Sequence, residues 1–313
     1  MSDIFNTAFM VALFSSGIRQ AVPLIFGSTG DSVSEKSGVL GICLEGEMLF
    51  GALFAYIVAL KSGSLWLGVL AGGLSGMMAS LIPAVWSVLL HQDQSITCIM
   101  FNIFAAGFTN FFNRIVFGTN IANIAIPTFE NIRIPLLADI PFLGPVLFQQ
   151  NLLTYLSIVL AILVSFLMKK TKWGLQLTSV GEDPRVAQAA GVNIYRFRIL
   201  AYMFCGFMAG LGGASLTLGS VGTFTEGITA GRGFICLTIV ILSRWNPLVA
   251  LLAAFGFGSI EALQIRLQVL GSSLPYQFLI ALPYLITIMV LAIGGSNLRA
   301  PKELGVPFEK ESR

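Results

Sequence analysis

The sequence predicts an all-α membrane protein, a polytopic transmembrane bundle of about eight or nine spans with one short helix on its cytoplasmic side. Composition is the first reason: 56% of the 313 residues are hydrophobic and only 11% are charged. The mean hydropathy of +0.85 is the second, because soluble globular domains rarely reach it. The third is a series of apolar runs, each close to the roughly 20 residues that cross about 30 Å of hydrocarbon.

Eight apolar runs follow one another along the chain, at about 4–27, 39–60, 65–90, 96–117, 152–168, 199–221, 247–263 and 274–293. The first has no basic residues before it and no cleavage pattern after it, so we expect a retained span and not a signal peptide. A ninth run, 233–243, is too short to cross alone. It is either half of a broken helix or part of a crossing that begins in the preceding ITAGR segment. We expect nine crossings, with eight plus a re-entrant half-helix as the alternative.

Basic residues predict the orientation, because Lys and Arg in short loops stay in the cytoplasm. The segment 169–198 is rich in them, so we expect it inside, with its first residues also anchoring lipid headgroups. The N-terminus and the 118–151 loop then lie outside, and the tail at 295–313 lies inside if the ninth run crosses. The loop is too apolar for a free linker and is expected to fold back over the outer mouth. The chain, 1–313, is thus expected to form a single membrane domain.

Several function classes fit the sequence poorly. A net charge of +3 is too small for a nucleic-acid surface. No G-x-x-x-x-G-K-[ST] loop occurs, so we expect neither an enzyme nor ATP hydrolysis by this chain itself. The single histidine, His91, offers no metal pair or catalytic triad, and no metal or cofactor is expected. Four cysteines stand singly in apolar sequence, so we expect packing roles and no disulfide or zinc site; they are Cys43, Cys98, Cys205 and Cys236.

Ionisable side chains inside spans are costly and are therefore candidates for function. Four stand out: Arg19, Glu45, Glu47 and Glu261. Glu45 and Glu47 point about 200° apart on a helix, so they cannot both face one passage. The structural alternative is that they lie near the cytoplasmic interface and cap or pair with a neighbouring helix, such as the one bearing Arg19.

A mixture of amides and phenylalanines marks the run ITCIMFNIFAAGFTNFFNRIVF. Amides can hydrogen-bond hydroxyls or base edges while aromatic faces stack, which suits a small, neutral, polar solute. Phe101, Asn102 and Asn110 therefore join Glu45, Glu47 and Glu261 as candidates for the solute pathway. Hydrogen bonding between helices is the alternative role for these amides, and for Asn113.

Small residues recur every fourth position in two runs, at Gly68, Gly72 and Gly76 and again at Gly206 and Gly210. This spacing places them on one helix face and lets backbones approach closely in lipid. The sequence therefore predicts a tightly packed bundle.

The stretch SVGEDPRVAQAAGVNIYRFR, residues 179–198, predicts a short helix in the cytoplasmic segment. Asp183 is a strong N-cap, Pro184 suits the first helical position, and Gly191 suits a left-handed end. The helix has about seven residues, too few to cross a membrane or to be stable in water without tertiary contacts. We therefore expect it to lie along the cytoplasmic face and to be held by other contacts.

Most of the chain resembles a known family. The resemblance is carried by this stretch with its continuation to Leu216, by the later GRGFICLTIVILSRWNPLVALLAAFGFGSIEAL and by the earlier SEKSGVLGICLEGEMLFGAL. It is similar to the permease subunits of bacterial ABC importers for branched-chain amino acids, simple sugars and nucleosides. The family's coupling segment reads G-E-[DN]-P-x-A-A-x-x-x-G, and Val186 departs from it. In the early motif, Gly41 and Glu47 replace a frequent asparagine and methionine. The resemblance implies an ATPase contact at Gly181, Glu182, Asp183, Pro184, Arg185, Ala187, Ala190 and Gly191.

The resemblance also implies partners and a solute. A cytoplasmic ATP-binding ABC subunit would seat the short helix in a cleft. A second homologous permease chain would form a heterodimer with this one, and an extracytoplasmic binding lipoprotein would deliver the solute. The motifs look most like nucleoside-type permeases of the bacterial inner membrane, with simple sugars and riboflavin as alternatives. An ion-coupled secondary transporter is a different class, and it would not need the capped cytoplasmic helix.

Overall fold

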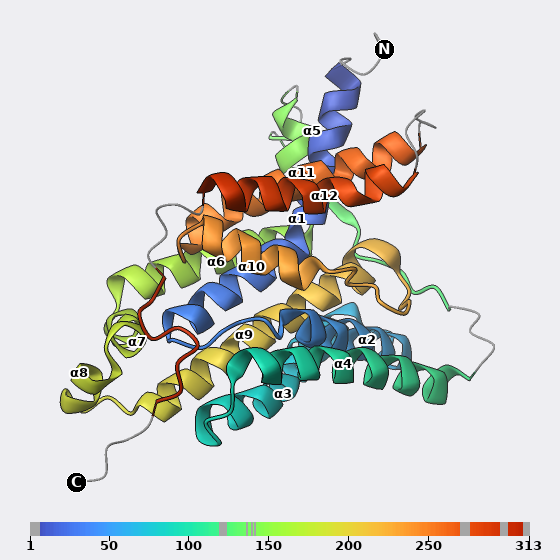
Figure 1. Ribbon diagram of the computed structural model, residues 1–313. Coiled ribbons are helices and arrows are strands. Elements are labelled where there is room, and N and C mark those ends of the chain that lie inside the picture. The colour runs from blue at the N-terminus through green and yellow to red at the C-terminus, as the bar shows by residue number, and fades with distance from the viewer. Residues whose placement is uncertain are drawn as a thin grey trace.

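Helices make up nearly all of the structure, a computed structural model that describes residues 7–118, 124–135, 137–138, 140, 142–269, 276–294 and 300–308 (Figure 1). The long helices are α1 (Thr7–Lys36), α2 (Leu44–Ser62), α3 (Leu65–Ala84), α4 (Gln94–Phe117), α6 (Leu152–Lys170), α9 (Ile194–Leu216), α11 (Pro247–Val269) and α12 (Tyr276–Gly294). The short ones are α5 (Leu143–Leu147), α7 (Lys172–Glu182), α8 (Pro184–Ala189) and α10 (Arg232–Leu242). Two π-helical turns, η2 (Val85–Leu89) and η3 (Thr217–Val221), extend α3 and α9.

The all-α membrane bundle predicted from the sequence is confirmed. Within the described residues, six helices are long and apolar enough to cross a membrane. They are Phe9–Lys36, Leu65–Leu89, Gln94–Phe117, Leu152–Lys170, Ile194–Val221 and Pro247–Val269. The helices α2, α10 and α12 add three further apolar segments, so the count of spans is compatible with the eight or nine expected.

The core lies around α9, which is the most buried of these spans. It packs against α1, α2 and α3, and α11 lies antiparallel to α1, where Gly17 faces Ser259 and Gly258 faces Ala21. Among the largest fully buried side chains are Phe26, Tyr202 and Met208. Exposed leucines, isoleucines and phenylalanines cover the outer faces of α3, α4 and α6, as expected for helices that face lipid.

Glycines bring α3 and α9 into direct backbone contact. A Cβ atom added to Gly76 would overlap the carbonyl oxygen of Gly206, and one added to Gly210 would overlap that of Gly72. The two glycine rows noted in the sequence therefore face each other. No larger residue fits at this crossing without moving a helix.

Two helices begin inside the bundle rather than at its ends. After α1, residues 37–43 fold back beside it, so that Gly41 lies against Asp31. The helix α2 starts there, at the level of Asn102, eight residues into α4. The short helix α10 starts beside it, because Gly233 packs on the backbone of Glu45. Both N-termini thus meet within the bundle. From this point α2 leads away over 19 residues, and α10 leads away as a half-length helix of 11 residues.

The two ends of the bundle differ, and we name them by what they carry. The coupling end holds α7, α8 and the described tail residues 300–308, where Glu303 N–H donates to the Gly181 carbonyl (3.0 Å) and Gly305 N–H to that of Gly38 (3.1 Å). After α9 reaches the far end, the chain returns through residues 222–245, with α10 as the second half of this path. Trp245 then lies at the coupling end, bonded to Glu35.

The described part of the 118–151 loop packs on the far end. Its strands β1 (Asn131–Arg133) and β2 (Gln149–Asn151) pair antiparallel, with Ile132 opposite Gln150. Ile126 N–H donates to Gly222 (2.9 Å), and Tyr56 donates to the carbonyl of Ile124 (2.8 Å). Residues 119–123 of the loop and 295–299 and 309–313 of the tail lie outside the described residues.

Candidate functional site

The short helix predicted in the 169–198 segment is present as α8. Asp183 is its N-cap, with Oδ1 accepting from the N–H of Val186 (3.1 Å), and Pro184 occupies the first turn. Gly191 follows the helix with φ +85°, and its N–H donates to the carbonyl of Gln188. This left-handed conformation favours glycine, so the sequence signals used to place the helix are the ones that form it.

The two faces of α8 differ in burial. Pro184 and Ala187 are buried, and Ala187 belongs to a small apolar cluster with Val180, Ile194 and Phe308. The bundle and tail therefore hold one face. The opposite face, with Glu182, Asp183, Arg185, Ala190 and Gly191, is exposed, and Val186 exposes 63% of its surface.

Gly181 ties this segment to the bundle. A Cβ atom there would overlap the carbonyl oxygen of Lys36 at the end of α1, and its own carbonyl accepts from Glu303. Displacement of α7 and α8 would therefore act directly on the end of α1 and on the tail. The contact is made by backbone atoms, so the glycine at position 181 is its only mark in the sequence.

A polar network joins the starts of α2 and α10. The Glu45 carboxylate accepts from Thr229 Oγ1 (2.6 Å), Gly231 N–H (2.8 Å) and Gly233 N–H (2.8 Å). Such bonds to a helix N-terminus stabilise a negative charge that would otherwise be costly in a membrane. The structure thus places Glu45 as a cap for a neighbouring helix, which is α10 and not the helix of Arg19.

The other two glutamates proposed for the pathway lie apart from that cap. Glu261, on α11, forms an ion pair with Arg232, the first residue of α10. Glu47 is 1% exposed and lies near Tyr202 and Cys205 of α9; neither of its carboxylate oxygens has a hydrogen-bond partner among the described residues. Glu45 and Glu47 therefore face different neighbours, as their spacing predicts.

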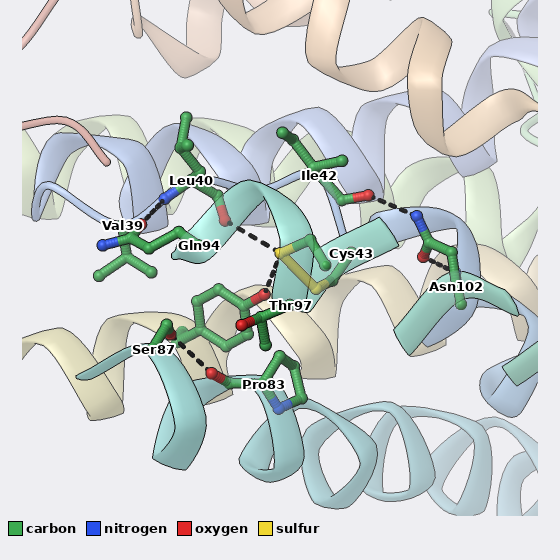
Figure 2. Close-up of a disulfide and its surroundings, with 12 residues drawn as sticks. Val39, Leu40, Ile42, Cys43, Pro83, Ser87, Gln94, Thr97 and Asn102 are labelled. Atoms are coloured by element: carbon green, nitrogen blue, oxygen red, sulfur yellow. Dashed lines mark hydrogen bonds between the residues drawn. A yellow bond between two sulfur atoms is a disulfide. The ribbon is translucent and has the colours of Figure 1, made fainter. Parts of the chain in front are cut away.

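The proposed pathway residues of α4 do not all lie at one place. Asn102 donates to the carbonyl of Ile42 (2.8 Å) and accepts from the N–H of Gly46 (2.9 Å), so it fixes the start of α2 (Figure 2). Phe101 is buried and stacks on Phe50, which also stacks on Phe108. Asn110, two turns beyond Asn102, has a buried Oδ1 without a partner among the described residues. The structure therefore brings Asn102 and Phe101 to the α2–α4 contact and leaves Asn110 separate.

The expectation that no cysteines would pair is wrong for Cys43 and Cys98, which form a disulfide with Cα atoms 4.6 Å apart (Figure 2). Cys43 precedes α2 and Cys98 lies near the start of α4, and Gln94 accepts from the N–H of Leu40 in the same region. The fold-back of 37–43 brings them together across 55 residues of sequence, and no local spacing reveals this. Cys205 and Cys236 are free and buried.

Sequence reasoning missed a second set of buried polar groups at the coupling end. Asp31 and Glu35 lie one turn apart on α1, both buried, and Glu35 accepts from Trp245 Nε1 (2.5 Å). Arg198 is 1% exposed and donates to the carbonyl of Val306 (2.9 Å). The sequence prediction ended the first span near residue 27, so Asp31 and Glu35 fell outside it and were not considered as charges within a span. Their spacing of four residues, in the stretch DSVSE (31–35), is the signal that was available.

Groups of three or more potential metal ligands do not occur among the described residues. The polar contacts of this region fix the starts of α2, α8 and α10. The family model described as branched-chain amino acid transport system / permease component matches residues 13–294. No solved structure gives a significant match.

Individual relatives match over most of their length. The guanosine ABC transporter permease protein NupQ of Bacillus subtilis is 35% identical, over 94% of this chain and 95% of its own. The nucleoside ABC transporter permease protein NupC of Lactococcus lactis is 35% identical, over 98% and 99%. The putative glucose ABC transporter permease protein TsgC13 of Haloferax volcanii is 32% identical, over 85% and 81%.

This chain also matches a second, less similar permease from each of the first two organisms. NupP of Bacillus subtilis is 23% identical over 78% of this chain and 71% of its own. NupB of Lactococcus lactis is 25% identical over 76% and 68%. With a family model that covers nearly the whole bundle, and relatives that match it from end to end, the chain belongs to the family of branched-chain amino acid transport system permease components.

Proposed function

We propose that this chain is the permease subunit of an ATP-driven importer that moves nucleosides across the bacterial cytoplasmic membrane. The observation that carries the proposal is α8, a capped helix with one face held by the bundle and an exposed face that includes Val186. The similarity to NupQ and NupC supports nucleosides as the solute.

The proposal includes three partners. A separate ATP-binding subunit docks on the exposed face of α8, because this chain has no phosphate-binding loop of its own. A second permease pairs with this one, which the presence of NupP beside NupQ and of NupB beside NupC supports. A binding lipoprotein presents the solute at the far end.

We place the coupling end in the cytoplasm and the far end outside, so that the N-terminus is external and the tail internal. The cluster of Lys169, Lys170 and Lys172, where α6 ends and α7 begins, supports this orientation, because such residues are retained inside. The tail lies on the same side, since Glu303 and Gly305 bond to Gly181 and Gly38.

Movement of the ATPase would reach the spans through rigid contacts. Asp183 and Gly191 fix the two ends of α8, and Gly181 transmits its displacement to the end of α1 without an intervening flexible side chain. Residues 37–43 continue from that end to the meeting point of α2 and α10. A push at α8 thus reaches the starts of α2 and of the half-length helix α10, which are suited to open and close a passage.

The solute pathway is proposed to run beside this meeting point. Glu45, Glu261 and Asn102 use their hydrogen-bonding groups to hold helix ends, so they would shape the passage and not bind the solute directly. Glu47, Phe101 and Asn110 are proposed as contacts made when the passage opens, and two of them already have unpartnered polar atoms. A neutral solute suits an interior in which most of the charges found are paired or capped.

Transport by proteoliposomes, with and without the ATPase subunit, tests the proposal. We expect nucleoside uptake that requires ATP, the ATPase and the binding lipoprotein. Asp183→Lys and Gly191→Val should insert normally and abolish transport-coupled ATP hydrolysis, because each disrupts one end of α8. Unchanged coupling in both variants would refute the docking role. A thermal-shift screen of the binding lipoprotein against nucleosides, sugars and flavins identifies the solute.

One observation favours a second candidate, an ion-coupled secondary transporter. The carboxylates of Asp31 and Glu47 are buried without partners, and α10 is a half-helix, as in many ion-coupled carriers. The same proteoliposomes distinguish the two functions. Uptake driven by a Na⁺ or H⁺ gradient in the absence of ATP would establish the second function and exclude the first.

A further inference from the structure

Two arginines, on α1 and on α11, have no acidic partner among the described residues. Arg19 is on α1, and Arg266 is one turn from the end of α11. Among the described residues, no carboxylate forms an ion pair with either one, although Arg114 and Arg232 are both paired.

The guanidinium of Arg266 is fixed in place. Its Nη2 donates to Ser16 Oγ (3.2 Å), and its Cζ lies 5.6 Å from the centre of the Phe9 ring. The Ser16 hydroxyl donates in turn to the carbonyl of Ala12, which leaves its lone pair free for the arginine. The Nε of Arg266 is buried and has no partner among the described residues. A charged donor is therefore held ready, with part of its hydrogen-bonding capacity unused.

A cavity of about 340 Å³ opens beside this guanidinium, between α1 and α11. Ser16, Gln20 and Arg266 supply polar groups to its wall, and Phe9, Ile265 and Val269 supply apolar surface. The residues follow helical spacing on both helices, so they form two facing stripes. This lining matches a molecule with an anionic head and an apolar chain better than a free ion.

We propose that the cavity between α1 and α11 binds the phosphate group of an anionic phospholipid, with Arg266 as the charged contact. Arginine binds phosphate oxygens through paired N–H groups. Arg266 lies in the last turn of α11, a helix long enough to span a membrane, so its guanidinium can reach the headgroup layer. None of the residues proposed for ATPase docking or for the solute pathway lines this cavity, so the lipid site is independent of that function.

Native mass spectrometry of the purified full-length protein tests the site, with phosphatidylglycerol, phosphatidylcholine and inorganic phosphate as probes. We expect phosphatidylglycerol to bind at least tenfold more tightly than phosphatidylcholine, and inorganic phosphate at millimolar concentration not to displace it. Arg266→Gln should weaken phosphatidylglycerol binding about tenfold. Arg114→Gln is the matched control, because that arginine is already paired with Glu226 at the same end, and it should leave binding unchanged.

Arg266→Lys keeps the charge and distinguishes loss of the site from loss of the fold. It should bind phosphatidylglycerol more weakly than the native protein and more tightly than Arg266→Gln. Equal binding of the two lipids, or full binding by Arg266→Gln, would overturn the proposal. Displacement by inorganic phosphate would instead assign the site to a free anion and would also overturn it.

Discussion

At the residue scale, several charged side chains inside this bundle are stabilised by specific partners. Glu45 receives three donors from the start of α10, and Arg232 faces Glu261 across to α11. Without such partners each group would cost about 2.5–3.5 kcal/mol at the centre of a membrane. The same residues therefore fix the position of α10, because moving that helix would separate charges from their partners.

Glu45→Gln should destabilise the protein although it changes little in shape. The amide keeps one acceptor oxygen and places an NH₂ group against backbone donors, so at least one charge-assisted bond is lost. We expect the free energy of unfolding to fall by about 2–3 kcal/mol, measured by thermal unfolding in detergent. Glu130→Gln, at an exposed loop position, is the control and should have no effect. Equal stability of the two variants would contradict the capping role.

The ion pair between Arg232 and Glu261 should behave as a unit in a double-mutant cycle. Arg232→Met leaves a buried carboxylate without its cation, and Glu261→Met leaves a buried cation, so each should destabilise by about 3–5 kcal/mol. The double variant removes both charges and should be more stable than either single variant. Additive losses in the cycle would mean that the two side chains contribute independently.

At the element scale, the sequence predicted what depends on local signals. The cap of α8 and its glycine end follow from Asp183, Pro184 and Gly191, and the α3–α9 contact follows from glycines spaced by four. The fold-back of 37–43 and the disulfide at Cys43 depend on contacts between distant segments, so no local pattern carried them. For the candidate pathway, the sequence showed which residue types are present, but it did not show which helix each side chain faces.

Gly76→Ala tests the close contact between α3 and α9. The added methyl group would overlap the backbone of Gly206, which can move only with its helix, so we expect a loss of about 1–3 kcal/mol. Gly107→Ala on α4 is the matched control. Its Cβ would meet no atom within 4 Å, and alanine should stabilise that helix by about 0.5–1 kcal/mol. Chemical denaturation of both variants gives the comparison, and a neutral Gly76→Ala would mean that the crossing is looser than described.

At the scale of the whole molecule, the tail joins elements that are distant in sequence. Residues 300–308 bond to the end of α1, to α7 and to α9, through Gly38, Gly181 and Arg198. The carbonyl of Phe308 also accepts from Tyr195 (3.2 Å) and lies 2.9 Å from Nε2 of His91. The segment that carries α8 is therefore connected to three regions of the bundle at once, and it should move with them as one body.

If the tail transmits movement of α8, then loosening it should uncouple transport from ATP hydrolysis. Phe308 is buried against Tyr195 and the cluster that holds Ala187, so Phe308→Ala removes packing worth about 3 kcal/mol while keeping the backbone bonds. In proteoliposomes with the ATPase, we expect several-fold less nucleoside carried per ATP hydrolysed. Val306→Ala alters a neighbouring, exposed side chain and should leave this ratio unchanged. A normal ratio in Phe308→Ala would mean that α8 acts through Gly181 and α1 alone.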